Sequence, residues 1–300
     1  MSFSANVKQE VCRLPLSKRC CSIAECFGIA LYCNTFSPQL LKIVTESPDF
    51  AERLPRLFKK AFGFGFDAAP EDGERAGKLV FLIQDGEKLR HIFQAFGFSI
   101  DGHVALHVNF GVLEDECCRV AFLRGAFLAG GSVTDPEKRY HLELITTHRK
   151  VSAETNVLLL DLGFFPKDTT RNGGSVLYFK QSNYIEDFLT TMGAPVCAMG
   201  VMEAKVEKDL RNGVNRRVNC DTANLTKTVD AAFDQVAAIH KLRDAGALED
   251  LPPRLRETAL LRLDEPEATL TELAERLDPK LTKSALNHRM RKLIALSKEV

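Results

Sequence analysis

The residues best suited to recognise another molecule lie close to the end of the chain. Lys283, Asn287 and Arg291 recur at intervals of four residues, which places them along one face of a predicted helix. Asparagine can pair bidentately with adenine and arginine with guanine, and a helix fits the major groove of DNA. The segment from Asp278 to Lys298 holds six basic residues and one acid, a local charge of +5 in a chain whose net charge is zero. This pattern predicts contact with double-stranded DNA, and a merely solvated basic face is the alternative.

The predicted contacts cover a broad face of this helix and its first residue. They are Thr282, Lys283, Ser284, Asn287, His288, Arg289, Arg291 and Lys292. Serine and threonine hydroxyls suit phosphates or base edges, and lysine suits phosphates.

Two further helices are needed to hold the basic helix in place. Thr269 and Glu272 have the spacing of a capping box, which predicts a helix start, and Thr282 is expected to cap the last helix. Apolar residues at helical spacing predict the buried faces: Leu255, Ala259, Leu260 and Leu263, then Leu270, Leu273, Ala274 and Leu277, then Leu286, Met290, Leu293 and Ile294. Three helices in this order are the plan of a helix-turn-helix domain, which we place at residues 228–300.

The segment before this domain is expected to be a linker, at residues 206–227. Asn212–Lys227 shows no helical or alternating pattern, which predicts irregular structure. The following stretch, Thr228–Ala245, is predicted to be a helix. Arg216 and Arg217 are further candidates for DNA contact, and an internal hydrogen-bond network that fixes the linker is the alternative role.

The first two hundred residues contain an internal repeat. Cys20–Phe36 resembles Cys117–Val133, and Gly28 aligns with Gly125 at an offset of 97 residues. A long repeat indicates two copies of one supersecondary unit packed about a pseudo-two-fold axis. We place the duplicated domain at residues 1–205, with repeats at about 18–97 and 115–193.

The repeat unit is predicted to be roughly αββαββα, with its paired strands forming one antiparallel sheet, and periodicity assigns bounds to only some of these elements. The predicted elements of the first copy are the helix Lys18–Cys33, the strand Leu40–Thr45, the helix Pro48–Phe62, the strand Lys78–Ile83 and the helix Gly86–Phe96, after a short helix Phe3–Leu14. Those of the second are Glu114–Ala129, Tyr140–Thr146, Ser152–Leu162, Val176–Lys180 and Asn183–Met192 in the same order. The fold class is therefore α+β, followed by an all-α domain.

The nine cysteines give no recognisable metal motif. None has CxxC spacing, and adjacent pairs such as Cys20-Cys21 and Cys117-Cys118 cannot easily share one metal, so reduced structural thiols are expected. No GxGxxG, P-loop, GxSxG or HExxH motif is present. We expect no cofactor, no metal and no catalytic residue.

The second repeat helix, which reads FLRGAFLAGGSV, resembles the signature helix of LAGLIDADG homing endonucleases. In that family each signature helix ends in a metal-binding acid, and the resemblance puts Cys33 and Gly130 at those positions. A thiol is a poor ligand for Mg²⁺ and glycine is none, so the resemblance implies a degenerate domain without nuclease activity. Of the nearby acids, Glu25 is interpreted as a solvated or packing-edge residue and Asp135 as a turn residue.

Three motifs, NRRVNCDTANLTKT, LPPRLRETALLRL and LTKSALNHRMRKL, resemble the WhiA family of bacterial DNA-binding regulators. That family joins a degenerate LAGLIDADG domain to a C-terminal helix-turn-helix. The resemblance covers nearly the whole chain and implies transcriptional regulation linked to cell division, the cell cycle, chromosome segregation or sporulation.

The resulting expectation is a non-enzymatic DNA-binding regulator. The start MSFSANVKQE lacks a signal-peptide core and no apolar run is long enough for a membrane span, so a cytoplasmic, nucleoid-associated protein without a membrane partner is expected. An active metal-dependent homing-type endonuclease is one alternative. The other is an adaptor that binds RNA polymerase or another regulator and uses only its C-terminal domain on DNA.

Overall fold

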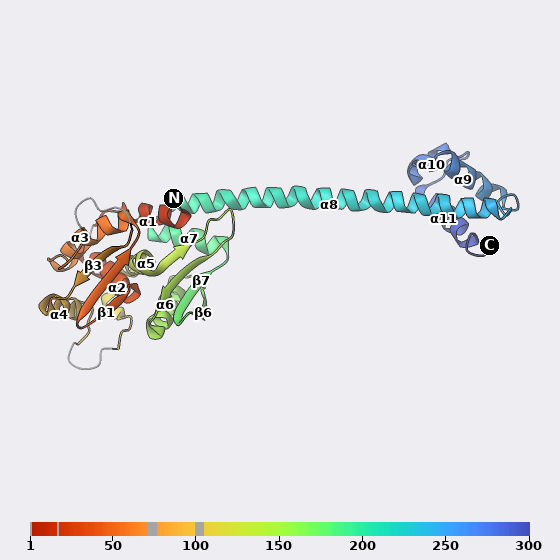
Figure 1. The fold of residues 1–300 in the computed structure, drawn as a ribbon. Coiled ribbons are helices and arrows are strands. Elements are labelled where there is room, and N and C mark those ends of the chain that lie inside the picture. Colours follow the sequence, from red (N-terminus) through yellow and green to blue (C-terminus); the bar gives the residue numbers. More distant parts are fainter. Residues whose placement is uncertain (1, 17, 71–76, 100–104) are drawn as a thin grey trace. The chain divides into compact units, whose positions relative to one another are not determined.

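The computed structural model describes residues 2–16, 18–70, 77–99 and 105–300, which form two compact units, residues 1–209 and 210–300. Figure 1 shows the ribbon of both units. Each unit has a hydrophobic core of its own, and each is described here separately. Among the described residues, no helix is both long and apolar enough to cross a membrane.

Unit 1 contains both copies of the repeat after the short helix α1 (Phe3–Cys12). The first copy consists of α2 (Arg19–Tyr32), β1 (Thr35–Ser37), β2 (Leu40–Thr45), α3 (Pro48–Phe62), β3 (Leu79–Ile83) and α4 (Gly86–Ala95). The second copy follows a 3-10 turn at Phe110–Val112 and consists of α5 (Glu116–Gly130), β4 (Gly131–Val133), β5 (Leu142–Thr146), α6 (Arg149–Asp161), β6 (Lys167–Arg171), β7 (Gly174–Phe179) and α7 (Ser182–Met192).

Each copy builds one antiparallel sheet, with the strand order β1-β2-β3 in the first and β4-β5-β7-β6 in the second. The fold class expected from the repeat, a duplicated α+β domain followed by a helical domain, is confirmed. Strand β6 was not predicted, because all of its residues are exposed and show no alternation. In the turn before β7, Asn172 and Gly173 have positive φ angles of 51° and 77°, as a tight hairpin needs.

The two signature helices, α2 and α5, pack directly against each other through the aligned glycines. A Cβ atom on Gly28 would lie 2.0 Å from the Phe122 carbonyl oxygen, and one on Gly125 would lie 2.0 Å from the Glu25 carbonyl oxygen. Only glycine permits two helix backbones to approach this closely. The reciprocal contacts show that the repeat offset of 97 residues corresponds to a pseudo-two-fold relation in space.

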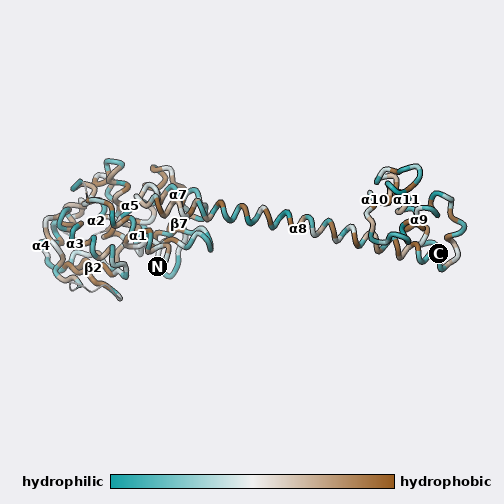
Figure 2. Tube along the Cα trace, turned by 90° about the horizontal axis from the view of Figure 1, so that it is seen from above, coloured by the Kyte–Doolittle hydropathy of each residue, from teal (hydrophilic) through white to brown (hydrophobic). Residues whose placement is uncertain are grey.

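Unit 2 is all helical, and the expectation for its first segment was wrong. Helix α8 runs from Pro195 to Asp244 and includes Asn212–Lys227, for which irregular structure was expected. This stretch is exposed on every side, so the helix has no buried face and leaves no apolar period in the sequence. Hydrophobic and hydrophilic residues are mixed along the trace of α8 (Figure 2), and residues 212–227 are all exposed.

The remainder of unit 2 has the expected three helices, α9 (Pro253–Asp264), α10 (Leu270–Arg276) and α11 (Lys283–Leu296). Its core is formed by Ile239, Leu242, Leu248, Leu255, Ala259, Leu273, Ala274, Leu277, Leu286, Met290 and Leu293. Leu260 was expected in this core but is 48% exposed, and Ile294 is only half-buried. A larger residue, Arg262, lies inside instead.

Candidate nucleic-acid interface

Helix α11 separates a buried face from a polar one. Leu286, Met290 and Leu293 are no more than 1% exposed and anchor the helix to α9 and α10. The Thr282 hydroxyl accepts a hydrogen bond of 3.2 Å from the Ala285 backbone N–H and so caps the helix start, as expected. This anchoring fixes which side chains point to solvent.

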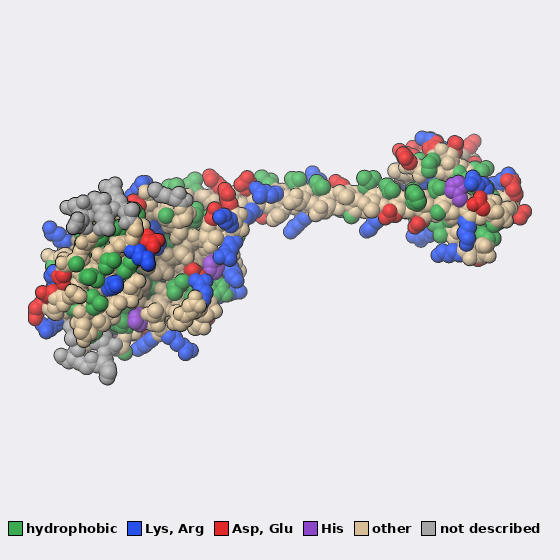
Figure 3. All heavy atoms as spheres, viewed as in Figure 1, with side chains coloured by type: hydrophobic (Ala, Val, Ile, Leu, Met, Phe, Trp, Pro, Cys, Tyr) green, Lys and Arg blue, Asp and Glu red, His purple; other side chains and the backbone are tan. Residues whose placement is uncertain are grey.

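Most of the predicted contact residues lie on the solvent side of α11. Lys283, Ser284, His288, Arg291 and Lys292 are exposed. Thr282 is exposed at the cap, and Asn287 is half-buried at the edge of the face. In the view of Figure 3, basic side chains gather over α11 near the C-terminus. The face therefore combines exposed cations with hydrogen-bonding groups.

Arg289 differs from its neighbours because it turns back onto the domain. Its guanidinium donates hydrogen bonds to the Arg254 carbonyl oxygen at 3.3 Å and to the Thr258 hydroxyl at 3.2 Å. Thr258 is fully buried on α9. Arg289 thus ties α11 to α9, a structural role that the count of basic residues could not distinguish from DNA contact.

The short helix α10 begins with the predicted capping box. The Glu272 carboxylate accepts the Thr269 backbone N–H at 2.7 Å, and the Thr269 hydroxyl accepts the Glu272 backbone N–H at 3.3 Å. After α10, the Leu281 backbone N–H donates to the Ala274 carbonyl oxygen at 3.0 Å, which closes the turn into α11. Ala274 is 1% exposed, so the two helices meet over a small side chain.

Arg262 positions the connection between α9 and α10, and sequence reasoning missed it. Its side chain is 1% exposed and donates to the carbonyl oxygens of Ala268 at 2.6 Å, Pro266 at 3.3 Å and Glu265 at 3.4 Å. Burial lowers the pKa of Arg262. The sequence predicted that Leu260 and Leu263 face the core. Nothing near Arg262 in the sequence indicates that its side chain is buried while Leu260 is exposed.

Arg216 and Arg217 both lie on exposed turns of α8. Within the part of the chain that the structure describes, neither guanidinium is seen in a hydrogen bond or ion pair, so the alternative of an internal network finds no support. Both side chains are accessible to a ligand of unit 2.

The C-terminal ends of the signature helices, where an endonuclease would hold its metal, carry no acid. The Cys33 thiol donates to the carbonyl oxygens of Ala30 at 3.2 Å and Thr35 at 3.3 Å, and burial raises its pKa to about 12. At Gly130 a Cβ atom would lie 2.4 Å from the Ile145 carbonyl oxygen. At Gly130 there is no space for a carboxylate side chain, and at Cys33 a neutral thiol takes the place of the acid.

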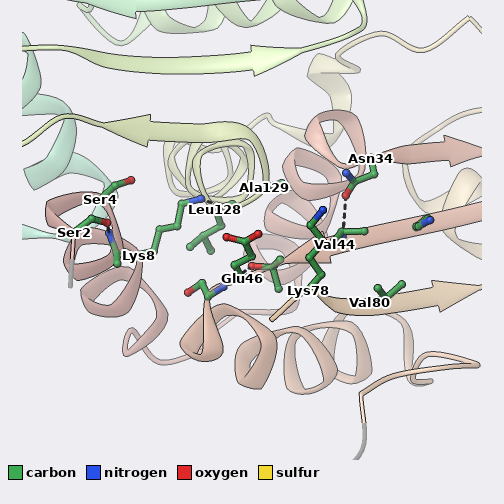
Figure 4. A pocket seen from close by; sticks show the side chains of 14 residues that line it. Ser2, Ser4, Lys8, Asn34, Val44, Glu46, Lys78, Val80, Leu128 and Ala129 are labelled. Atoms are coloured by element: carbon green, nitrogen blue, oxygen red, sulfur yellow. Dashed lines mark hydrogen bonds between the residues drawn. The ribbon is translucent and has the colours of Figure 1, made fainter. Parts of the chain in front are cut away.

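A lysine ammonium lies at this same end of α5. Lys8 on α1 donates to the Leu128 carbonyl oxygen at 3.1 Å, and burial lowers the pKa of Lys8. Lys8, Lys42 and Lys78 line a cavity of about 760 Å³ beside the first sheet (Figure 4). A fixed cation beside the helix ends opposes the binding of a divalent metal there.

Glu25 was expected to be a solvated or packing-edge residue, and that interpretation is wrong. Its side chain is 3% exposed and accepts two hydrogen bonds from Arg53, from Nε to Oε1 at 2.6 Å and from Nη2 to Oε2 at 2.9 Å. Arg124 approaches the same carboxylate at 3.5 Å. Asp135 is a turn residue as expected, since its carboxylate accepts the Glu137 backbone N–H at 3.0 Å. Glu25 is therefore engaged by arginines, and Asp135 lies beyond β4 rather than at the end of α5.

Comparison with known proteins gives the same division of the chain. The family described as "WhiA C-terminal HTH domain" matches residues 214–297, and the "WhiA LAGLIDADG-like domain" matches residues 119–211. A "Probable cell division protein WhiA" of Ruminiclostridium cellulolyticum is 39% identical, over 100% of this chain and 98% of the relative. Its counterpart in Alkaliphilus oremlandii is 38% identical, over 98% and 96%. The crystal structure of full-length DUF199/WhiA from Thermatoga maritima is 26% identical, with a TM-score of 0.59 over 100% of this chain and 99% of that one.

Proposed function

Because the chain belongs to the WhiA family, whose members are named as probable cell division proteins, we propose that it is a non-enzymatic DNA-binding regulator. Its target is double-stranded DNA, bound through the helix-turn-helix of unit 2 with α11 in the major groove. The work of unit 1 is then to position or regulate this module rather than to cleave the DNA.

The observation that carries the proposal is the outward face of α11. Arg291, Ser284 and His288 project from a helix whose opposite side is locked into the core. A recognition helix needs this rigidity, because bidentate base contacts depend on a fixed side-chain origin. Asn287 at the edge of the face has the donor and acceptor that adenine requires.

Binding to a specific site, found by a genome-wide occupancy map, tests the proposal. Arg291→Ala and Asn287→Ala should each weaken specific binding by about 1–3 kcal/mol if each residue contacts a base. Lys292→Ala should weaken binding to all sequences alike and reduce the salt slope by about one, as loss of a phosphate contact does. Arg243→Ala, which removes an exposed arginine of the same unit, is the matched control.

Wild-type affinity in the three α11 variants, with circular dichroism showing an intact fold, would exclude α11 as the recognition helix. Equal weakening by Arg243→Ala would point to general charge rather than a specific face.

The absence of nuclease activity is part of the proposal. We expect no Mg²⁺- or Mn²⁺-dependent cleavage of plasmid DNA by the full chain, since Cys33 and Gly130 supply no carboxylate and Lys8 supplies a positive charge. Specific linear products that disappear with a chelator would contradict this.

The cellular role proposed here is transcriptional regulation of cell division, chromosome segregation or sporulation genes, with the protein on the nucleoid. A protein partner such as RNA polymerase is the second candidate activity of unit 1. Occupancy mapping of wild type and Arg291→Ala distinguishes the two: peaks that persist in the variant would show recruitment through a protein rather than through α11.

A further inference from the structure

The starts of α2 and α5 bring two pairs of adjacent cysteines together. Cys20 and Cys21 lie in the first turn of α2, and Cys117 and Cys118 lie in the first turn of α5. Because the helices cross at the aligned glycines, their N-terminal turns are neighbours. From the sequence, adjacent cysteines were not expected to share one metal. In the fold, the sulfurs of the adjacent residues Cys20 and Cys21 lie within 4.8 Å of each other and of the Cys118 sulfur, so they can face one ion.

The four sulfur atoms form a compact cluster. The Sγ atoms of Cys20, Cys21 and Cys118 all lie within 4.8 Å of one another. The Cys117 and Cys118 sulfurs lie within the same limit, and Cys21 is within hydrogen-bonding reach of Cys117. The offset of 97 residues relates Cys20 to Cys117 and Cys21 to Cys118. The cluster therefore follows the pseudo-two-fold axis, with each repeat contributing two thiols.

This arrangement matches the ligand set of a tetrahedral thiolate site. With Zn–S bonds of about 2.3 Å, neighbouring sulfurs in such a site lie about 3.8 Å apart, so a shift of at most about 1 Å brings the three closest thiols to that distance. Four soft sulfur ligands select Zn²⁺ over hard cations such as Mg²⁺. One disulfide engages only two of the thiols, whereas one zinc ion engages all four.

The surroundings suit a dianionic zinc–tetrathiolate centre. Two helix N-termini point their partial positive charge toward it, and the Lys18 ammonium lies 4.0 Å from the Cys117 sulfur. Cys118 is 3% exposed whereas Cys20 is exposed, so a buried ligand is held in place and the ion has an entry route. We propose that Cys20, Cys21, Cys117 and Cys118 bind one Zn²⁺ ion, which joins the two repeats at the N-terminal ends of their signature helices.

Proton release is a consequence of this site. Burial and the neighbouring thiols raise the pKa of Cys21 to about 11, so the free thiol is neutral near pH 7. Because the ligands bind as thiolates, loading the site with metal must displace protons into solution.

The experiment uses the full chain, stripped with a chelator under reducing conditions and titrated with Co²⁺ and then Zn²⁺. Wild type should develop the visible absorption of tetrahedral cobalt thiolate, saturating at about one equivalent, and lose it when Zn²⁺ is added. Cys20→Ser should weaken Zn²⁺ binding by more than about 10-fold. Cys20 is exposed, so this change leaves the core intact. Cys220→Ser, which removes an exposed thiol of α8, should bind like wild type.

Alkylation followed by mass spectrometry gives a second readout. Zn²⁺ should protect Cys20, Cys21 and Cys117 from alkylation and leave Cys220 reactive. Absence of the cobalt spectrum, or equal Zn²⁺ affinity in Cys20→Ser and wild type, would overturn the proposal. So would formation of a Cys20–Cys118 disulfide at the same rate with and without Zn²⁺.

Discussion

Removal of Arg53 should destabilise unit 1 far more than removal of a neighbouring exposed arginine. Arg53 holds the buried Glu25 carboxylate and also donates to the carbonyl oxygens of Cys12 at 3.1 Å and Leu14 at 2.6 Å. These bonds connect α3 to α2 and to the end of α1. In Arg53→Ala the carboxylate stays buried with only the more distant contact to Arg124.

The magnitude follows from the burial of both partners. Breaking a buried ion pair by removing one member costs about 3–5 kcal/mol, because a charge remains without compensation. For a domain of about 200 residues each kcal/mol lowers the midpoint by about 2–4 °C, so the melting temperature of unit 1 should fall by about 6–20 °C. Arg56, also on α3, pairs with Glu52 where both side chains are more than 60% exposed, and Arg56→Ala should cost at most about 1 kcal/mol.

Thermal and urea unfolding of the full chain, followed by circular dichroism, measure both variants. The single variants Glu25→Leu and Arg53→Leu and the double variant Glu25→Leu/Arg53→Leu form a cycle, in which the double variant should be more stable than Arg53→Leu because it removes the stranded charge. Equal midpoints for Arg53→Ala and Arg56→Ala would refute the reasoning. So would single-variant losses that simply add in the double variant.

Three other outcomes are expected. In Gly125→Ala the new Cβ meets the Glu25 carbonyl oxygen at 2.0 Å, so the helices must separate at a cost of about 1–3 kcal/mol, and an unchanged urea midpoint would contradict this contact. The hydrogen bond from the Thr269 backbone N–H lowers the pKa of Glu272. The stability that the Glu272 carboxylate adds to α10 is therefore fully present above the ordinary glutamate pKa and is lost as the pH falls through the lowered pKa. An NMR titration that gives Glu272 a pKa at or above the ordinary value would refute this. Arg216→Ala/Arg217→Ala should lower the DNA affinity of the full chain and reduce the salt slope by about two, and an unchanged slope would remove both residues from the interface.

Elements with complete local signals were predictable from the sequence. The strand Leu40–Thr45 and the helix Pro48–Phe62 have the bounds that were expected. The strand alternates buried and half-buried residues along its length. The Ser47 hydroxyl caps the helix at the Phe50 N–H, and Gly63, with φ of 87°, ends it in a left-handed conformation. Each of these signals lies within a few residues of the feature it determines.

Features that depend on distant partners were not predictable. Glu25 sits in an otherwise apolar helix, and its partner Arg53 is 28 residues away in the sequence. Arg262 is buried and Leu260 is exposed, the reverse of what hydrophobicity predicts. The reason is that carbonyl oxygens of the following turn accept hydrogen bonds from the Arg262 guanidinium. Nothing within a local window shows these acceptors.

The helix that carries the candidate interface, α11, was predicted from the sequence, and its DNA contacts stay predictions. Tertiary contacts decide the role of one of the predicted residues. Arg289 has the same residue type and local charge as Arg291, but only Arg289 has acceptors on α9 within reach. The thiol cluster shows the same limit: its spacing arises from the offset between repeats rather than from neighbours along the chain.

The fusion of both repeats into one chain has a genetic consequence. In a homodimer of single repeats, every codon change appears on both sides of the axis. Here Glu25 corresponds to Phe122, which contacts the Phe27 ring with centroids 5.5 Å apart, so an acid and an aromatic ring occupy equivalent places. Tandem duplication allows one half to acquire a charge for Arg53 while the other half keeps an aromatic contact. The two glycines at the crossing remain alike because each faces the other's backbone, and mutation of either would separate both halves.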